Sequence, residues 1–308
     1  MNKKTALMGI IIFILGISVC NMTSVSAAKS KFVVNTVNGK KTLVKYKGKD
    51  KIVEIPNGVK VIGDSAFKNN QYVRTVKFSD TVRTIEYGSF ANCKKLKTIT
   101  FNKDFKSIQG QPFINCRGIK KLRLNKNLKN ISEFGLTGMP NLKKISVAKG
   151  NKHFRVYKGA LFTKNLRKLY LYPEKNKLRT KFIIPKETRL VNACAFSDNK
   201  YLKKLIVKNS IIDGEDTFSN MKSLETIIFE KPYRLSVGLN DCKKLKFVKL
   251  AEGTEQIGEE QFSGCENLTV INFPKSLRYI GKNAFAGCSK IKKPVFTNNV
   301  EVDAEAFE

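Results

Sequence analysis

Residues 85–101 read IEYGSFANCKKLKTITF, and the apolar residues of this stretch recur along much of the chain at steps of 21–23 residues. Phe90 stands 23 residues from both Phe67 and Phe113, and the repeat isoleucines keep the same step. We call the residues equivalent to Phe90 the anchor residues; they include Phe67, Phe90, Phe113, Phe196, Phe218, Leu239, Phe262, Phe285 and Phe307. A period of this length is typical of stacked units that cannot bury their apolar faces alone. The sequence therefore predicts a repeat solenoid, and binding is the activity expected of such a fold.

Each repeat also predicts one short β-strand. Ile99 and Phe101 alternate with polar residues, and Ile271 and Phe273 do the same in a later copy. This period of two is that of a strand with one buried face and one solvent face. We expect mainly β structure, little helix, and strands at residues 53–55, 76–78, 99–101, 122–124, 145–147, 205–207, 227–229, 248–250 and 271–273.

The repeat resembles the BspA-like, or treponemal-type, leucine-rich repeats, whose unit reads IGxxAFxxCxxLxxIxLP. Residues 62–67 (IGDSAF) and 280–288 (IGKNAFAGC) carry the resemblance most closely, and it covers roughly residues 43–308. It implies a curved, right-handed leucine-rich-repeat stack with one short parallel strand per repeat of about 23 residues.

The chain is expected to divide into five segments. The repeat register is interrupted after Lys149, where the sequence looks like a longer, hairpin-bearing insert that is also seen in that family. The segments are a signal peptide at 1–27, an N-terminal β cap at 28–61, a first block of leucine-rich repeats at 62–148, the insert at 149–190 and a second block at 191–308.

The N-terminus predicts export. Lys3 and Lys4 precede an apolar run, and small residues around Ala27 and Ala28 follow it. This arrangement is that of a secretory signal peptide cleaved near Ala27/Ala28. We expect no lipoprotein at Cys20, because Val19 stands where a small residue normally precedes the modified cysteine. No later segment has the apolar length of a membrane helix, so we expect a secreted or cell-surface-associated protein with no transmembrane segment in its mature form.

The cysteines follow the repeat. Five of them lie three residues after an anchor residue, namely Cys93, Cys116, Cys242, Cys265 and Cys288. In other repeats the same position holds Asn70, Met139, Asn199 or Met221, so it accepts a compact buried side chain. This favours structural thiols, although disulfides between neighbours such as Cys93 and Cys116, or Cys265 and Cys288, stay open at this point.

Catalytic constellations are not apparent in the sequence. His153 is the single histidine, so a catalytic triad or a multi-histidine metal site cannot be assembled within one chain. Acidic residues fall in turn positions, where they are commonplace. We therefore expect no enzyme, no catalytic residues, no cofactor and no metal site.

Charge points to a partner. The chain has a formal net charge of +33, and removal of the signal peptide with Lys3 and Lys4 leaves +31 (33 − 2). Lysine pairs recur in register, for example at Lys94–Lys95 and Lys243–Lys244, and stacking would align them in a stripe. A functional cationic stripe and an ordinary lysine-rich surface are both compatible with this pattern.

Strand geometry indicates where a partner would bind. Residues that alternate with the buried strand positions project from the face that leucine-rich repeats use as their concave surface. The candidate ligand-binding residues on this face are Thr75, Lys77, Thr98, Thr100, Lys121, Arg123, Lys144, Lys204, Lys208 and Lys249. We expect Lys121, Arg123, Lys144 and Lys204 to form its electrostatic centre.

The family resemblance implies an adhesin that recognises a host matrix or cell-surface protein or glycan through the concave face. The alternative is a cationic binder of anionic cell-wall polymer or acidic polysaccharide, which would retain the protein at its own envelope. Nucleic acid is disfavoured, because no aromatic platform interleaves with the basic residues of that face. An enzyme is the weakest of the hypotheses.

Overall fold

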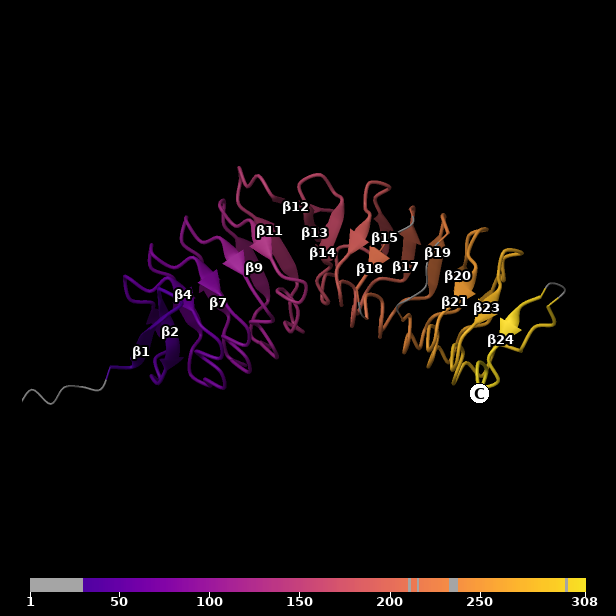
Figure 1. Cartoon of the computed structure of the whole chain (residues 1–308), viewed down its shortest axis with the longest axis horizontal. Coiled ribbons are helices and arrows are strands. Elements are labelled where there is room, and N and C mark those ends of the chain that lie inside the picture. The colour runs from indigo at the N-terminus through magenta and orange to yellow at the C-terminus, as the bar shows by residue number, and fades with distance from the viewer. Residues whose placement is uncertain (1–29, 210–211, 215, 233–237, 297–298) are drawn as a thin grey trace, which may run out of the picture. The chain divides into compact units, whose positions relative to one another are not determined.

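Two ladders of short parallel strands run through residues 31–308, and Figure 1 shows the coils between them side by side in sequence order. The structure is a computed structural model that describes residues 30–209, 212–214, 216–232, 238–296 and 299–308. The segment predicted as a signal peptide, with its cleavage site, lies outside these residues. The described part of the chain is mainly β and has no helix, and therefore none that could cross a bilayer.

The first ladder, which we call the strand ladder, carries the strands predicted from the alternating pattern. Its members in the first block are β3 (Ile52–Glu54), β5 (Thr75–Lys77), β7 (Thr98–Thr100), β9 (Lys121–Leu124) and β11 (Lys144–Val147). Its remaining members are β15 (Lys181–Ile184), at the end of the insert and grouped with the second block from here on, and β17 (Lys204–Val207), β19 (Thr226–Phe229), β20 (Phe247–Lys249) and β22 (Val270–Ile271). The predicted strand in each repeat is confirmed, and the observed strands begin about one residue earlier, because the outward residue before the first buried one also pairs through its backbone.

The second ladder, which we call the bridge ladder, was not predicted. It consists of short strands at the repeat isoleucines: β4 (Val61–Ile62), β6 (Thr84–Ile85), β8 (Ser107–Ile108), β10 (Asn130–Ile131), β14 (Lys168–Leu171), β16 (Leu190–Val191), β18 (Ile212–Asp213), β21 (Gln256–Ile257), β23 (Tyr279–Ile280) and β24 (Glu301–Val302). Most of these strands are only two residues long, too short for an alternating pattern to show in the sequence. Among the described residues, strand pairing links many neighbouring coils along both ladders and is interrupted between β7 and β9 and between β11 and β15 in the strand ladder, and between β10 and β14 and between β18 and β21 in the bridge ladder.

The anchor rings form the centre of the core. Phe90 is fully buried, and its ring centroid lies 5.1 Å from that of Phe67 and 6.1 Å from that of Phe113, both stacked. The same stack appears in the second block between Phe262 and Phe285, at 5.3 Å. Stacking over fully buried area makes these rings the main apolar contribution of each coil.

The turn after each anchor residue has a left-handed residue that the sequence pattern also encodes. Asn92 has φ of 59°, and its side-chain amide donates to Oδ1 of Asn69 at 2.9 Å, while the amide of Asn115 donates to Oδ1 of Asn92 at 2.9 Å. The residues with positive φ at this position are Asn69, Asn92, Asn115, Gly138, Asp198, Asn220, Asp241, Gly264 and Gly287. Asn, Asp and Gly are the residues that tolerate this conformation, so the position is fixed by backbone sterics.

The five cysteines that lie three residues after an anchor residue, which we call the ladder cysteines, are thiols. Sγ of Cys93 donates to the carbonyl oxygen of Phe67 at 3.0 Å, and Sγ of Cys116 donates to that of Phe90 at 3.1 Å. Cys242, Cys265 and Cys288 are also buried thiols that donate to the preceding coil, at 3.1–3.3 Å. The structure therefore contains no bridge between Cys93 and Cys116 or between Cys265 and Cys288, and each thiol instead joins two coils.

A hairpin begins the stack. Strands β1 (Phe32–Val37) and β2 (Lys40–Tyr46) pair antiparallel, and β2 then pairs parallel with β4. The ring of Tyr46 lies 4.9 Å from that of Phe67 and covers the first anchor residue.

A second hairpin lies within the predicted insert. Strands β12 (Phe154–Tyr157) and β13 (Ala160–Thr163) pair antiparallel, β13 pairs antiparallel with β14, and β14 continues the bridge ladder toward β16. The hairpin turns at Lys158 and Gly159. Gly159 stands five residues after Phe154, just as the anchor residue Phe90 stands five residues after Ile85. One anchor turn is therefore replaced by a hairpin turn, and the anchor series resumes at Tyr172, whose ring stacks on Phe196 at 5.6 Å.

Candidate binding face

The outward residues of the strand ladder form aligned rows, and we call this surface the strand face. In the first block Thr75 pairs with Thr98 and Lys77 with Thr100. The rows continue in β9 and β11, where Lys121 pairs with Lys144 and Arg123 with Ser146. Because successive parallel strands lie about 4.8 Å apart, residues in one row are near neighbours in space.

The ten predicted site residues all lie on or beside this face. Nine belong to strands of the strand ladder, and Lys208 directly follows β17. Thr75 and Lys204 are half-buried, and the other eight residues are exposed. The structure thus places the nine strand residues on the outward side of their strands and Lys208 just beyond the end of β17.

Three of the four residues of the expected electrostatic centre come together. Lys121, Arg123 and Lys144 share the pair of strands β9 and β11, and we call them the cationic cluster. Lys204 lies apart from them in β17, where it pairs with Lys181 of β15. Both of these strands follow the hairpin in the sequence, whereas β9 and β11 precede it. All four residues occupy outward positions in their repeats, but the insert separates Lys204 from the cationic cluster.

The cationic cluster lacks carboxylate partners. Among the described residues, ion pairs occur elsewhere, for example between Lys77 and Glu54 at 2.8 Å, but none involves Lys121, Arg123 or Lys144. Residues 105–173 contain sixteen Lys and Arg residues and a single acidic residue, Glu133. The net charge of the whole chain does not show that the basic residues are concentrated in this segment. Their concentration produces a strong local positive potential.

The strand face of the second block is more apolar. Ile183, Ile206 and Ile228 lie in one row and are half-buried, and the next residue of that row is Lys249. The neighbouring row ends with Val270, which is 50% exposed. The strand face therefore changes from cationic and hydroxylic in the first block to a mixture of aliphatic, aromatic and basic residues in the second.

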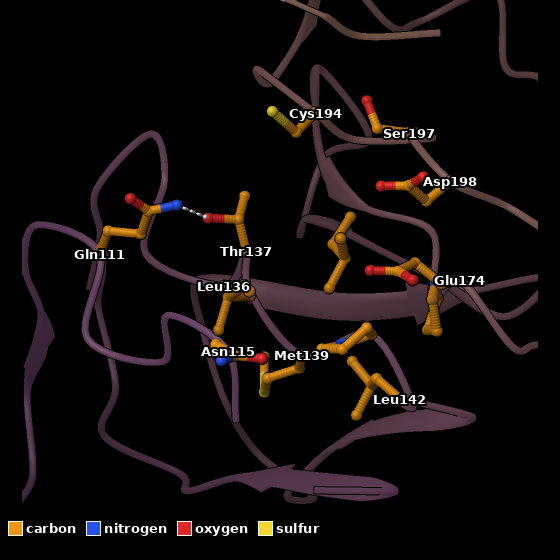
Figure 2. Close-up of a pocket in the computed structure, with 14 residues that line it drawn as sticks. Gln111, Asn115, Leu136, Thr137, Met139, Leu142, Glu174, Cys194, Ser197 and Asp198 are labelled. Carbon is orange, nitrogen blue, oxygen red and sulfur yellow. Dashed lines mark hydrogen bonds between the residues drawn. The ribbon is translucent and has the colours of Figure 1, made fainter. Parts of the chain in front are cut away.

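A cavity of about 300 Å³ lies where the hairpin turn replaces an anchor turn. It lies between the turn after Leu136 and residues that follow Leu171. Figure 2 shows the carboxylates of Glu174 and Asp198 on one side of it and Gln111 and Thr137, which are hydrogen-bonded at 2.8 Å, on the other. No exposed aromatic ring lines this cavity.

Burial raises the pKa of Glu174 to about 7, and the negative charge of Asp198 adds to the effect. Desolvation disfavours the ionised carboxylate, and a second carboxylate nearby disfavours it further. Glu174 therefore exchanges a proton near neutral pH.

Burial also keeps the ladder thiols protonated. It raises the pKa of Cys93 and of Cys242 to about 12 in each case. Because the thiolate is the reactive form, these thiols are inert at neutral pH. In the described ranges, no three His, Cys, Asp or Glu side chains gather in a group that could hold a metal ion.

Comparison with known proteins identifies the repeat. The profile of the BspA type leucine rich repeat region matches in six copies, over residues 44–165, 170–237 and 237–308. The chain belongs to this family. No curated protein matches the sequence.

Solved structures share the fold of this BspA-type protein. A leucine-rich repeat protein from Eubacterium ventriosum has a TM-score of 0.68 and 21% sequence identity, with 87% of each chain covered. The pneumococcal vaccine antigen PcpA has a TM-score of 0.50 and 18% identity, with 89% of this chain and 92% of that chain covered. At these identities the likeness concerns the coil stack alone.

Proposed function

We propose that this BspA-type protein is a non-catalytic binding protein that works outside the cell as an adhesin, attaching through its strand face to a host matrix or to a protein or glycan of a cell surface. The observation that carries the proposal is the cationic cluster of Lys121, Arg123 and Lys144, exposed in register on two strands and forming no ion pair with a described carboxylate. The predicted signal peptide supports export, and repeat solenoids commonly bind through such extended faces.

A second candidate uses the same surface for a different partner. The protein would bind an anionic polymer of its own cell wall and so remain at the envelope. The excess of sixteen basic residues over one acidic residue in 105–173 favours it, because such a density of like charge attracts any polyanion.

Charge reversal at the strand face tests both candidates. We would replace Lys121, Arg123, Lys144 and Lys204 by Glu and measure attachment to matrix-coated surfaces and to isolated cell walls. Attachment to the true target is expected to fall at least about tenfold, because contacts worth about 1 kcal/mol or more become repulsive. The fold should persist, since exposed substitutions usually change stability by about 0.5 kcal/mol each.

The matched control reverses four exposed lysines outside the strand face. Lys60, Lys68, Lys103 and Lys186 lie in turns and connections outside the strands and outside the repeated lysine pairs, and none of them forms an ion pair among the described residues. Equal loss in both variants would show that only net charge matters and would refute recognition by the strand face. Raising salt from about 0.15 M to 1 M, where the Debye length falls from about 8 to 3 Å, should abolish wall-polymer binding and leave part of a packed protein interface.

A further inference from the structure

The hairpin insert and β11, the last strand of the first block, line an open hollow of about 460 Å³. Four cationic side chains line it, namely Lys144, Lys149, Arg155 and Lys164, and all four are exposed. Within the part of the chain that the structure describes, no acidic residue lines it and none of the four forms an ion pair with a carboxylate. We call this site the cationic hollow.

The walls of the cationic hollow are held in place by buried hydrogen bonds. Asn151 is 2% exposed; its amide donates to the carbonyl oxygens of Asn125 and Leu128 at 2.9 and 3.0 Å, and its Oδ1 accepts from the amides of His153 and Phe154. These contacts fix the turn that leads from β11 to β12 onto the preceding coil. A binding site whose backbone is already fixed loses less conformational freedom when a ligand enters.

The hairpin side is also restrained. The amide of Lys164 donates to the carbonyl oxygen of His153 at 2.7 Å, which holds the end of β13 beside the start of β12. The guanidinium carbon of Arg155 lies 6.0 Å from the ring centroid of Tyr157, at the outer range of a cation–π contact. The two contacts restrain the backbone at Lys164 and the side chain of Arg155, and both of these residues line the cationic hollow together with Lys144.

We propose that the cationic hollow binds a sulfate or phosphate ester group carried on a linear carbohydrate or polyol chain, and that the insert thereby completes the binding site of the strand face. The proposal rests on the proposed function, and it names the chemical group that the strand face recognises. The guanidinium of Arg155 presents a planar fork of donors that suits a tetrahedral oxyanion, and the lysines add point charges around it. A volume of about 460 Å³ is within the usual range for a small-ligand site.

The lining disfavours a nucleobase. Ile145 and Phe154 are buried at 3% and 2% exposure, and Val147 and Val156 are half-buried, so no open aromatic face is available for stacking. Single-stranded nucleic acids bind mainly where aromatic platforms alternate with cations. The exposed cations instead attract an oxyanion by charge, which needs no stacking surface.

The test compares two triple variants of the full chain that lose the same charge. The hollow variant carries Lys149→Gln, Arg155→Gln and Lys164→Gln, and the control variant carries Lys60→Gln, Lys68→Gln and Lys103→Gln. Dissociation constants would be measured for a heparin octasaccharide, its desulfated form, an oligomer of glycerol phosphate and a dT12 oligonucleotide. Thermal melts of each variant check that the fold is kept.

For the ester-bearing ligand that binds more tightly, we expect a dissociation constant at least about tenfold higher in the hollow variant than in the wild type, and less than about threefold higher in the control variant. The desulfated octasaccharide should bind weakly to the wild type. Preference for the heparin octasaccharide would identify a sulfate source, and preference for the glycerol phosphate oligomer a phosphate source. Arg155→Lys keeps the charge but loses the fork, and a several-fold weakening would support oxyanion recognition directly.

Other outcomes would overturn the proposal. Wild-type affinity in the hollow variant, together with loss in the strand-face charge reversal, would exclude the cationic hollow and leave the proposed function intact. Full affinity in both would overturn the proposed function as well. Equal weakening of the hollow and control variants would reduce binding to bulk charge, and tighter binding of dT12 than of either polymer would make the ligand a nucleic acid.

Discussion

The two blocks of coils have the same interior and different strand faces. Phe90 in the first block and Phe262 in the second are both fully buried and stacked on an anchor ring of the next coil. Outward positions differ, because the row that ends in Arg123 and Ser146 in the first block holds Ile206 and Ile228 in the second. Packing between coils constrains every inward residue, whereas an outward residue meets mainly its row neighbours and solvent. The differences between the two blocks therefore concentrate on the strand face.

The anchor rings offer the largest test of the common interior. Phe90→Ala and Phe262→Ala should each lower the free energy of unfolding by about 3–5 kcal/mol, through lost burial and the cavity left between neighbouring coils. Urea unfolding followed by circular dichroism measures the effect. As a control, Lys77→Ala breaks only the exposed ion pair with Glu54 and should cost less than about 1 kcal/mol. If one anchor variant were harmless, the two blocks would not share a common core.

Much of the interior could be predicted from the sequence. The spacing of Phe67, Phe90 and Phe113 and the alternation around Ile99 were sufficient for the coil stack and the strand ladder, because both depend on local apolar period. The bridge ladder could not be seen in this way, since a two-residue strand has no period. Tyr172 was missed as an anchor residue because the insert changes the spacing before Phe196, and only the packed structure shows the two rings stacked.

The candidate site was predicted in part. Alternation placed the nine strand residues on the outward side of the strand ladder, which depends only on local strand geometry. The separation of Lys204 from Lys144 and the contribution of Arg155 and Lys164 depend on where the hairpin folds back. That is a long-range contact, which no local pattern in a single sequence specifies.

The junction between the blocks gives a smaller, pH-dependent effect. The pKa of Glu174 is raised from its ordinary value of 4.5 to about 7, first by burial. Between these values the folded chain keeps a proton that the unfolded chain has lost, so this contribution to stability is complete below about pH 4.5 and is lost as the pH rises through about 7. Glu174→Gln should therefore stabilise the protein at pH 8 by roughly 1–2 kcal/mol, allowing for partial solvent access, and leave stability at pH 4 unchanged.

Unfolding midpoints of wild type and Glu174→Gln, measured from pH 4 to pH 8, check this expectation. A constant difference between the two proteins across that range would show that the substitution acts through packing and not through the proton. Asp198→Asn is the matched variant on the same cavity, and it should lower the pKa of Glu174 toward its ordinary value by removing the neighbouring charge.

The ladder thiols give the smallest of these effects and compare the two blocks at one position. Cys93→Ala and Cys242→Ala should each cost about 1 kcal/mol, because each removes one hydrogen bond to the preceding coil and a small apolar volume. Cys93→Asn should cost less than Cys93→Ala, since the amide of Asn199 donates to the preceding coil from the same position, at 3.2 Å.

Alkylation by iodoacetamide at pH 8 measures the thiols without mutation. With the pKa of Cys93 and Cys242 raised to about 12 by burial, both should stay unmodified in the folded protein and react only after urea unfolds it. Protection in both blocks would show that the thiols link coils equally throughout the stack. Rapid labelling confined to Cys242 would instead show that the second block opens more readily. The two blocks would then have the same kind of packing but different local stability.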